Sequence, residues 1–123
     1  MSLFQTELIQ QEERNYERLE LAPEHRPMME GIAKILGQFL EISHIALKGF
    51  IWRSLKQLQV DHNVTIEEIA SMTPQERGKY AIEAFDSLRG FLYKILRNTE
   101  DKTVIDEAVN KGIEFYKQNF MNR

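Results

Sequence analysis

Apolar residues recur every three or four positions along most of the chain, which is the period of an amphipathic α-helix. No window alternates apolar and polar residues over a useful length, so the sequence predicts no strands. The pattern predicts an all-α fold, a four-helix-type bundle with a long central helix and one short extra helix. Because 123 residues is close to the commonest domain size, we expect a single helical-bundle domain spanning residues 1–123.

The first predicted helix, residues 2–20, carries few apolar side chains. Phe4, Leu8 and Leu19 share one narrow face, whereas the middle of the segment, QQEERNYER, is almost wholly polar. Such a helix packs weakly or depends on a partner. The segment Leu21–Pro27 is the predicted first loop, because each proline disfavours the helical conformation in the residue before it.

The longest apolar pattern begins at Pro27, a good first-turn residue, and runs to about Val60. At roughly 100° per residue, its apolar side chains gather in an arc about 200° wide. These side chains are Ile32, Ile35, Leu36, Phe39, Leu40, Ile42, Ala46, Leu47, Phe50, Ile51 and Leu58. So wide an arc must be covered by more than one neighbouring helix, so we expect this segment to be the central helix, which would be roughly 50 Å long if it were continuous. The alternative is a break near Ser43–His44.

Two later helix starts carry capping signals. Thr65 and Glu68 have capping-box spacing and predict a short helix from Thr65. The sequence TPQE at 73–76 supplies an N-cap threonine, a proline at the first helical position and a glutamate three residues after the cap. The remaining predicted elements are a helix from there to about Arg97, a loop at Asn98–Lys102 and a last helix from about Thr103 to Asn119.

Ile45 and Trp52 are seven residues apart, so they lie two turns from each other on the predicted central helix. Their line runs through a stripe that is otherwise polar and contains Lys48. Either the first helix crosses there, or the stripe binds a partner or a second copy, since aromatic residues are enriched in interface cores. The predicted protein interface consists of Ile45, Trp52, Lys48, Phe4 and Leu8.

Two further positions on the central helix stand out. Arg53 falls inside the apolar arc and, if buried, needs a carboxylate, for which Asp86 and Glu12 are the candidates. Gly49 lies at the edge of the arc, and Gly112 at the edge of the apolar face of the last helix. A missing side chain at these edges allows helices to approach closely or leaves room for a ligand.

Composition narrows the range of functions. The chain has no cysteine, which removes disulfides, thiolate nucleophiles and sulfur-ligated metal sites. A formal net charge of −3 argues against a dedicated nucleic-acid binder. Gln5 and Glu7 interrupt the N-terminal apolar residues, and the most apolar stretch, Ile32–Trp52, carries charged side chains. We therefore expect no signal peptide, no membrane span and a soluble cytoplasmic protein.

Candidate chemistry is sparse. The sequence contains no G-x-S-x-G, no phosphate-binding glycine-rich loop and no H-E-x-x-H. Glu41-x-x-His44 has the spacing found in di-iron bundles, but those sites need a second such motif and two further glutamates. Neither His25 nor His62 follows a glutamate at that spacing. The sequence therefore predicts no enzyme, no metal and no cofactor.

Two short segments resemble known families. HIALKG, residues 44–49, resembles the pattern of histidine phosphotransfer domains, four-helix bundles whose reactive histidine is followed closely by lysine and glycine. Here Lys48 and Gly49 follow His44 by four and five residues, where the family uses three and four. The resemblance implies phosphotransfer through an exposed His44. Residues 65–85 resemble a helix-turn-helix without its usual glycine, which would imply a nucleic-acid-associated subunit.

The function that we expect from the sequence is a non-enzymatic protein–protein interaction module, either a small regulator, an adaptor or an assembly subunit. We expect it to associate with itself, as a homodimer or larger homo-oligomer, through the predicted interface. The first alternative is a bundle that binds a ligand or a signal, including the phosphotransfer case. The second is the nucleic-acid-associated subunit.

Overall fold

The computed structural model describes residues 3–17, 26–97 and 99–121, and all the regular elements in these ranges are helices. The all-α class predicted from the sequence is therefore confirmed. The elements are α1 (Leu3–Glu17), α2 (Arg26–Leu36), α3 (His44–His62), α4 (Ile66–Ala70), α5 (Pro74–Leu96), α6 (Lys102–Tyr116) and the π-helix η2 (Lys117–Met121), which continues α6.

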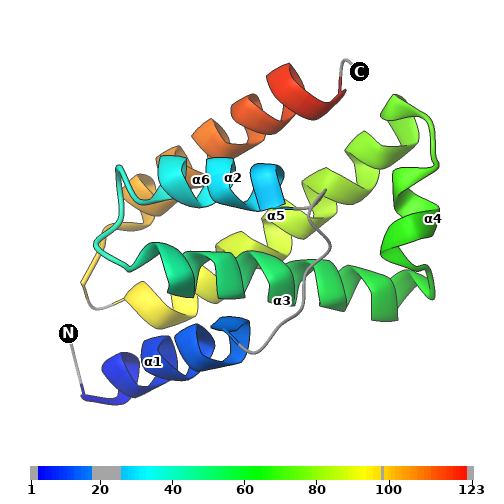
Figure 1. Ribbon diagram of the computed structural model, residues 1–123. Helices are drawn as coiled ribbons and strands as arrows, with labels where there is room; N and C mark the ends of the chain where they lie inside the picture. Colours follow the sequence, from blue (N-terminus) through cyan, green and yellow to red (C-terminus); the bar gives the residue numbers. More distant parts are fainter. Residues whose placement is uncertain (1–2, 18–25, 98, 122–123) are drawn as a thin grey trace.

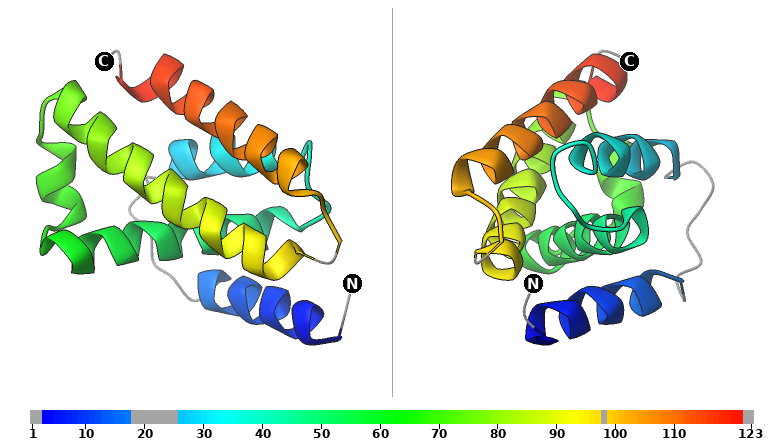
Figure 2. Two further views of the ribbon diagram at one scale, coloured as in Figure 1. Left: turned by 180° about the vertical axis from the view of Figure 1, so that it is seen from behind. Right: turned by 90° about the vertical axis from the view of Figure 1, so that its left-hand side faces the viewer.

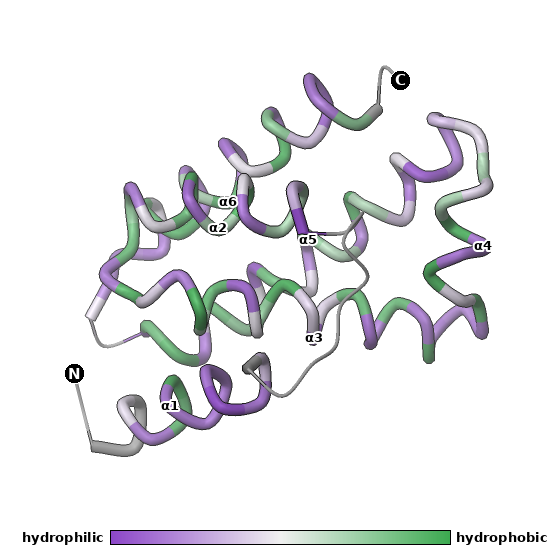
Figure 3. Tube along the Cα trace, viewed as in Figure 1, coloured by the Kyte–Doolittle hydropathy of each residue, from purple (hydrophilic) through white to green (hydrophobic). Residues whose placement is uncertain are grey.

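The helix α3 lies at the centre of the fold and contacts α1, α2 and α5 (Figure 1). Seen from the side, α1 forms one layer alone, α3 and α5 form the middle layer, and α2 lies with α6 in the third layer (Figure 2). Hydrophilic residues make up much of α1, whereas apolar residues recur along each of the other long helices (Figure 3). The core is therefore built between the middle and third layers, with α1 packed on its outer side.

The long apolar segment from Pro27 to Val60 is not one continuous helix, because the structure divides it into α2 and α3. The chain turns through residues 37–43, and the Ser43 side chain accepts a 3.2 Å hydrogen bond from the Ala46 backbone N–H to cap α3. The break that the sequence left open near Ser43–His44 is thus real, and it extends back to Gly37.

The apolar pattern runs through this turn because the turn itself is part of the core. Leu40 is 2% exposed and Ile42 is 9% exposed, although neither belongs to a helix. Leu40 still donates its backbone N–H to the Leu36 carbonyl, as in a last helical turn. Gly37 leaves space for the His44 imidazole, whose Nε2 would lie 2.7 Å from a Cβ at position 37. Hydrophobic spacing alone could not distinguish this buried turn from a helix.

The helices α4 and α5 begin where the capping signals in the sequence predicted. Thr65 and Glu68 form both hydrogen bonds of a capping box at the start of α4. The Thr73 hydroxyl accepts a 3.3 Å hydrogen bond from the Glu76 backbone N–H, and Pro74 is the first residue of α5. The short extra helix and the long helix after it are therefore confirmed. The last helix extends two residues beyond its predicted end at Asn119, through η2.

Some predicted boundaries fall outside the described residues. The first helix is described from Leu3 to Glu17, within the predicted range of 2–20. Most of the predicted loop Leu21–Pro27 is not described, and Arg26 and Pro27 already belong to α2. Asn98, in the predicted loop before the last helix, is likewise outside the described residues. In the described ranges, no helix combines the length and hydropathy needed to span a membrane.

Candidate functional site

The residues predicted as a protein interface lie where α1 meets α3. Trp52 and Leu8 are partly buried and pack against the core, and Ile45 and Lys48 are also partly buried. Phe4 belongs to α1, but its side chain is outside the described part of the chain. In this structure α1 therefore covers part of the polar stripe, which is the intramolecular arrangement weighed from the sequence.

A close contact and two cation interactions hold α1 on α3. A Cβ at Gly49 would lie 2.9 Å from the backbone oxygen of Glu12, so the absence of a side chain lets the two helices approach. The buried carboxylate of Glu12 pairs with the half-exposed guanidinium of Arg53. The Lys48 ammonium lies 5.3 Å from the centre of the Tyr16 ring. Burial raises the pKa of the Glu12 carboxyl, and the nearby Arg53 charge partly offsets that rise.

A cavity of about 210 Å³ lies between α3, α4 and α5, where α3 and α5 diverge toward α4 (Figure 2), and residues of α2, α6 and η2 complete its lining. Most of its lining is apolar, and α4 closes one end with side chains that are partly buried. The apolar lining includes Trp52, Leu55 and Leu58 from α3, Ile66 and Ile69 from α4, and Ala81, Ala84 and Leu88 from α5. The small side chains of α5 face the diverging end of α3, which leaves the space unfilled.

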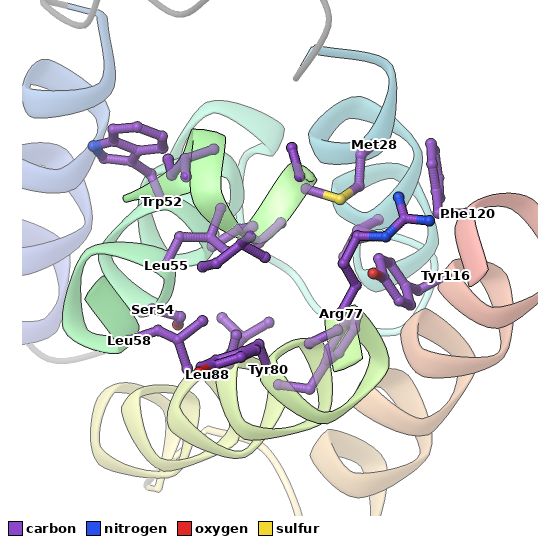
Figure 4. A pocket seen from close by; sticks show the side chains of 18 residues that line it. Met28, Trp52, Ser54, Leu55, Leu58, Arg77, Tyr80, Leu88, Tyr116 and Phe120 are labelled. Atoms are coloured by element: carbon purple, nitrogen blue, oxygen red, sulfur yellow. The ribbon is translucent and has the colours of Figure 1, made fainter. Parts of the chain in front are cut away.

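Few polar groups reach this cavity. The Ser54 hydroxyl donates a 2.9 Å hydrogen bond to the Phe50 carbonyl, so it is already satisfied. Arg77 and Tyr116 lie together in one wall, opposite Trp52 (Figure 4). Burial raises the pKa of the Tyr116 hydroxyl, and the Arg77 charge partly offsets the effect, so the hydroxyl stays a hydrogen-bond donor at neutral pH. Arg77 and Tyr116 therefore form a polar wall, and Ser54 and Tyr80 are the other polar residues in a lining that is mainly apolar.

Trp52 belongs both to this cavity and to the joint with α1. Its indole lines the cavity, while its Nε1 atom is directed toward α1 (Figure 4). Nε1 is buried and has no hydrogen-bond partner among the described residues. A buried donor left without an acceptor costs about 1–3 kcal/mol. Because Trp52 is the only tryptophan in the sequence, its fluorescence reports on both places.

The residues considered for metal binding and phosphotransfer do not form a built site. Glu41 lies in the turn between α2 and α3, so it does not share one helix with His44 as the di-iron spacing requires. His44 is exposed at the first position of α3, with its imidazole against Gly37. Within the described ranges, no three histidine, aspartate or glutamate side chains come together in a way that could hold a metal ion.

Sequence reasoning identified Trp52 but missed the cavity that Trp52 lines. Arg77 belongs to the segment 65–85 that resembles a helix-turn-helix, and in the structure α4 and α5 of that segment form a wall of the cavity. Ala81 and Ala84, two small residues on the apolar face of α5, were the available signal, because small side chains opposite large ones can leave a void.

Comparison with known proteins adds no relative to this picture. The chain matches no protein-family model, and no curated protein and no solved structure is similar to it at a significant level.

Proposed function

We propose that this protein is a non-enzymatic binding protein that takes a small apolar molecule into the cavity between α3, α4 and α5. This is the ligand-binding alternative considered from the sequence. The observation that supports it is the cavity itself, about 210 Å³ in volume and lined mainly by aliphatic and aromatic side chains. Ligand sites are typically concave and apolar, with a few polar groups that orient the ligand.

The energetic cost of such a void supports the same proposal. Protein interiors are close-packed, and voids larger than a water molecule are few. The space is partly open to solvent, so water contacts apolar side chains there that a ligand could cover. A bound apolar molecule would offset much of this cost.

The test is a titration of the protein with 1-octanol, followed by Trp52 fluorescence and by the melting temperature. Because the indole lines the cavity, we expect a saturable change in its emission and a melting temperature that rises with ligand concentration. Ala81→Leu adds three carbon atoms inside the cavity and should weaken binding at least about tenfold, or about 1.4 kcal/mol.

Lys79→Leu is the matched control, since Lys79 is exposed on the same helix and does not line the cavity. This variant should bind octanol as the wild type does. The proposal is wrong if the wild-type protein shows no saturable binding, or if Ala81→Leu binds octanol as tightly as the wild type.

A second proposal is the protein-binding function expected from the sequence, with self-association through Ile45 and Trp52. Val60 is the only large apolar side chain that is exposed in the described part of the chain, at 77%. A docking face would therefore form only if α1 moved off α3. The unpartnered Nε1 of Trp52 favours this proposal, because a partner that accepted its hydrogen bond would relieve a buried unsatisfied donor.

Sedimentation velocity over a wide concentration range tests self-association. The proposal expects a dimer that forms as concentration rises and that Trp52→Ala abolishes, while Val60→Ala leaves it unchanged. If Trp52→Ala lowers only the melting temperature and the wild-type protein stays monomeric, the protein-binding proposal fails and the ligand-binding proposal is unaffected.

A further inference from the structure

The volume of the cavity sets how much of a ligand it can enclose. A cavity of about 150 Å³ holds benzene, which has six carbon atoms. Scaled by volume, a cavity of about 210 Å³ holds about eight carbon atoms. The apolar part of the ligand is therefore a single ring with a short substituent, or an alkyl chain of that length.

The charge distribution in the lining indicates the chemistry of the other end of the ligand. Arg77 is the one charged residue among the 18 that line the cavity in the described part of the chain, and no aspartate or glutamate is among them. Its Nε atom is buried. Figure 4 shows its guanidinium near Met28 and Phe120, with the Tyr116 ring beside it and the indole of Trp52 across the cavity.

The position of Arg77 on its helix adds to the positive potential. Arg77 is the fourth residue of α5 and therefore lies near the positive end of the helix dipole. The Tyr116 hydroxyl, which remains protonated at neutral pH, is a second donor in the same wall. A guanidinium and a hydroxyl together suit an acceptor with two oxygens, which is the geometry of a carboxylate.

Resting on the ligand-binding proposal above, we propose that the natural ligand is an amphipathic carboxylic acid. Its apolar part, about eight carbon atoms, fills the space between Trp52, Leu55 and Ala81, and its carboxylate pairs with Arg77. A neutral lipid or alcohol of the same length would fill the same space without using the charge of Arg77.

The experiment compares octanoate with 1-octanol at pH 7, where the carboxyl is ionised, by isothermal titration calorimetry on the full chain. The wild-type protein should bind octanoate at least about tenfold more tightly than octanol, since hydrogen bonds to charged groups are worth that much. Arg77→Met should remove this preference and leave octanol binding unchanged. Arg77→Lys, which keeps the charge but loses the planar guanidinium, should retain part of it.

Arg97→Met is the matched control, because Arg97 is an exposed residue that follows α5 and does not line the cavity. It should preserve the preference for octanoate. The inference is overturned if the wild-type protein binds octanol as tightly as octanoate, or if Arg77→Met weakens both ligands equally. If the wild-type protein binds neither, the proposed function itself fails. Should Arg77→Met not fold, the wild-type comparison and Arg77→Lys still decide the question.

Discussion

The joint between α1 and α3 offers a direct test of the packing described here, through the substitution Gly49→Ala. Gly49 is buried on α3 at the point where the backbone of α1 crosses it. The added methyl group would lie 2.9 Å from the backbone oxygen of Glu12 and 3.3 Å from its Oε2 atom. The first distance is too short for a carbon–oxygen contact, and rotating a side chain cannot relieve it because the oxygen belongs to the backbone.

Two effects of opposite sign decide the size of the change. Replacing glycine by alanine within a helix stabilises it by about 0.5–1 kcal/mol. Overpacking a tight contact costs about 1–3 kcal/mol. We expect the second effect to win by about 1 kcal/mol, which lowers the melting temperature of a domain of this size by about 4 °C. Because the strain falls on α1, that helix should be displaced before the rest of the fold is affected.

Urea unfolding and Trp52 fluorescence measure the two consequences separately. Gly49→Ala should lower the unfolding midpoint and shift the Trp52 emission to longer wavelength, since α1 then shields the indole less from water. Gly90→Ala is the control, because a Cβ at Gly90 would meet no atom within 4 Å. It should gain about 0.5–1 kcal/mol from helix propensity alone. The reasoning is refuted if Gly49→Ala is as stable as Gly90→Ala.

Three further predictions concern other parts of the fold. Burial raises the pKa of Glu12, so the folded protein is more stable when this carboxyl is protonated. That contribution to the free energy of unfolding is fully present below the ordinary pKa of 4.5 and is lost as pH rises through the raised pKa. Glu12→Gln cannot ionise, so its stability relative to the wild type should increase across that window in urea titrations at stepped pH; a constant difference would contradict this. Thr73→Ala removes the cap of α5 and should lower the free energy of unfolding by about 1 kcal/mol in thermal unfolding. The control is Thr103→Ala, at an exposed position within α6, which should leave the free energy of unfolding almost unchanged. Leu40 lies in a turn but is buried, so Leu40→Ala should lower the free energy of chemical unfolding by about 2–5 kcal/mol. If the decrease is no larger than that of Gln38→Ala, at an exposed position in the same turn, the turn is not part of the core.

The features predicted most accurately from the sequence are the helix starts, which short-range interactions determine. The starts of α4 and α5 depend on Thr65, Thr73 and the glutamates three residues after them, so a window of four residues contains the whole signal. The break between α2 and α3 was left open because Leu40 and Ile42 continue the apolar pattern through a turn. The Ser43 cap was visible in the sequence, but spacing alone does not show that the residues before it leave the helix.

The cavity could not be predicted because no single segment contains it. It depends on the angle at which α3 and α5 diverge, and that angle follows from packing among residues far apart in the chain. The sequence identified Trp52 as unusual and offered the crossing of the first helix as one explanation, which agrees with the position of α1. It gave no reason to associate Trp52 with Arg77, 25 positions later in the sequence.

The double position of Trp52 makes the two faces of α3 thermodynamically dependent on each other. On one side of α3 the indole packs against α1, and on the other side it lines the cavity. A molecule that binds in the cavity and shifts the ring changes the equilibrium constant for packing of α1 on α3. By reciprocity, packing of α1 changes the affinity for that molecule by the same factor. If the proposed ligand shifts the Trp52 ring on binding, occupancy of the cavity and attachment of the N-terminal helix are therefore coupled through this one side chain.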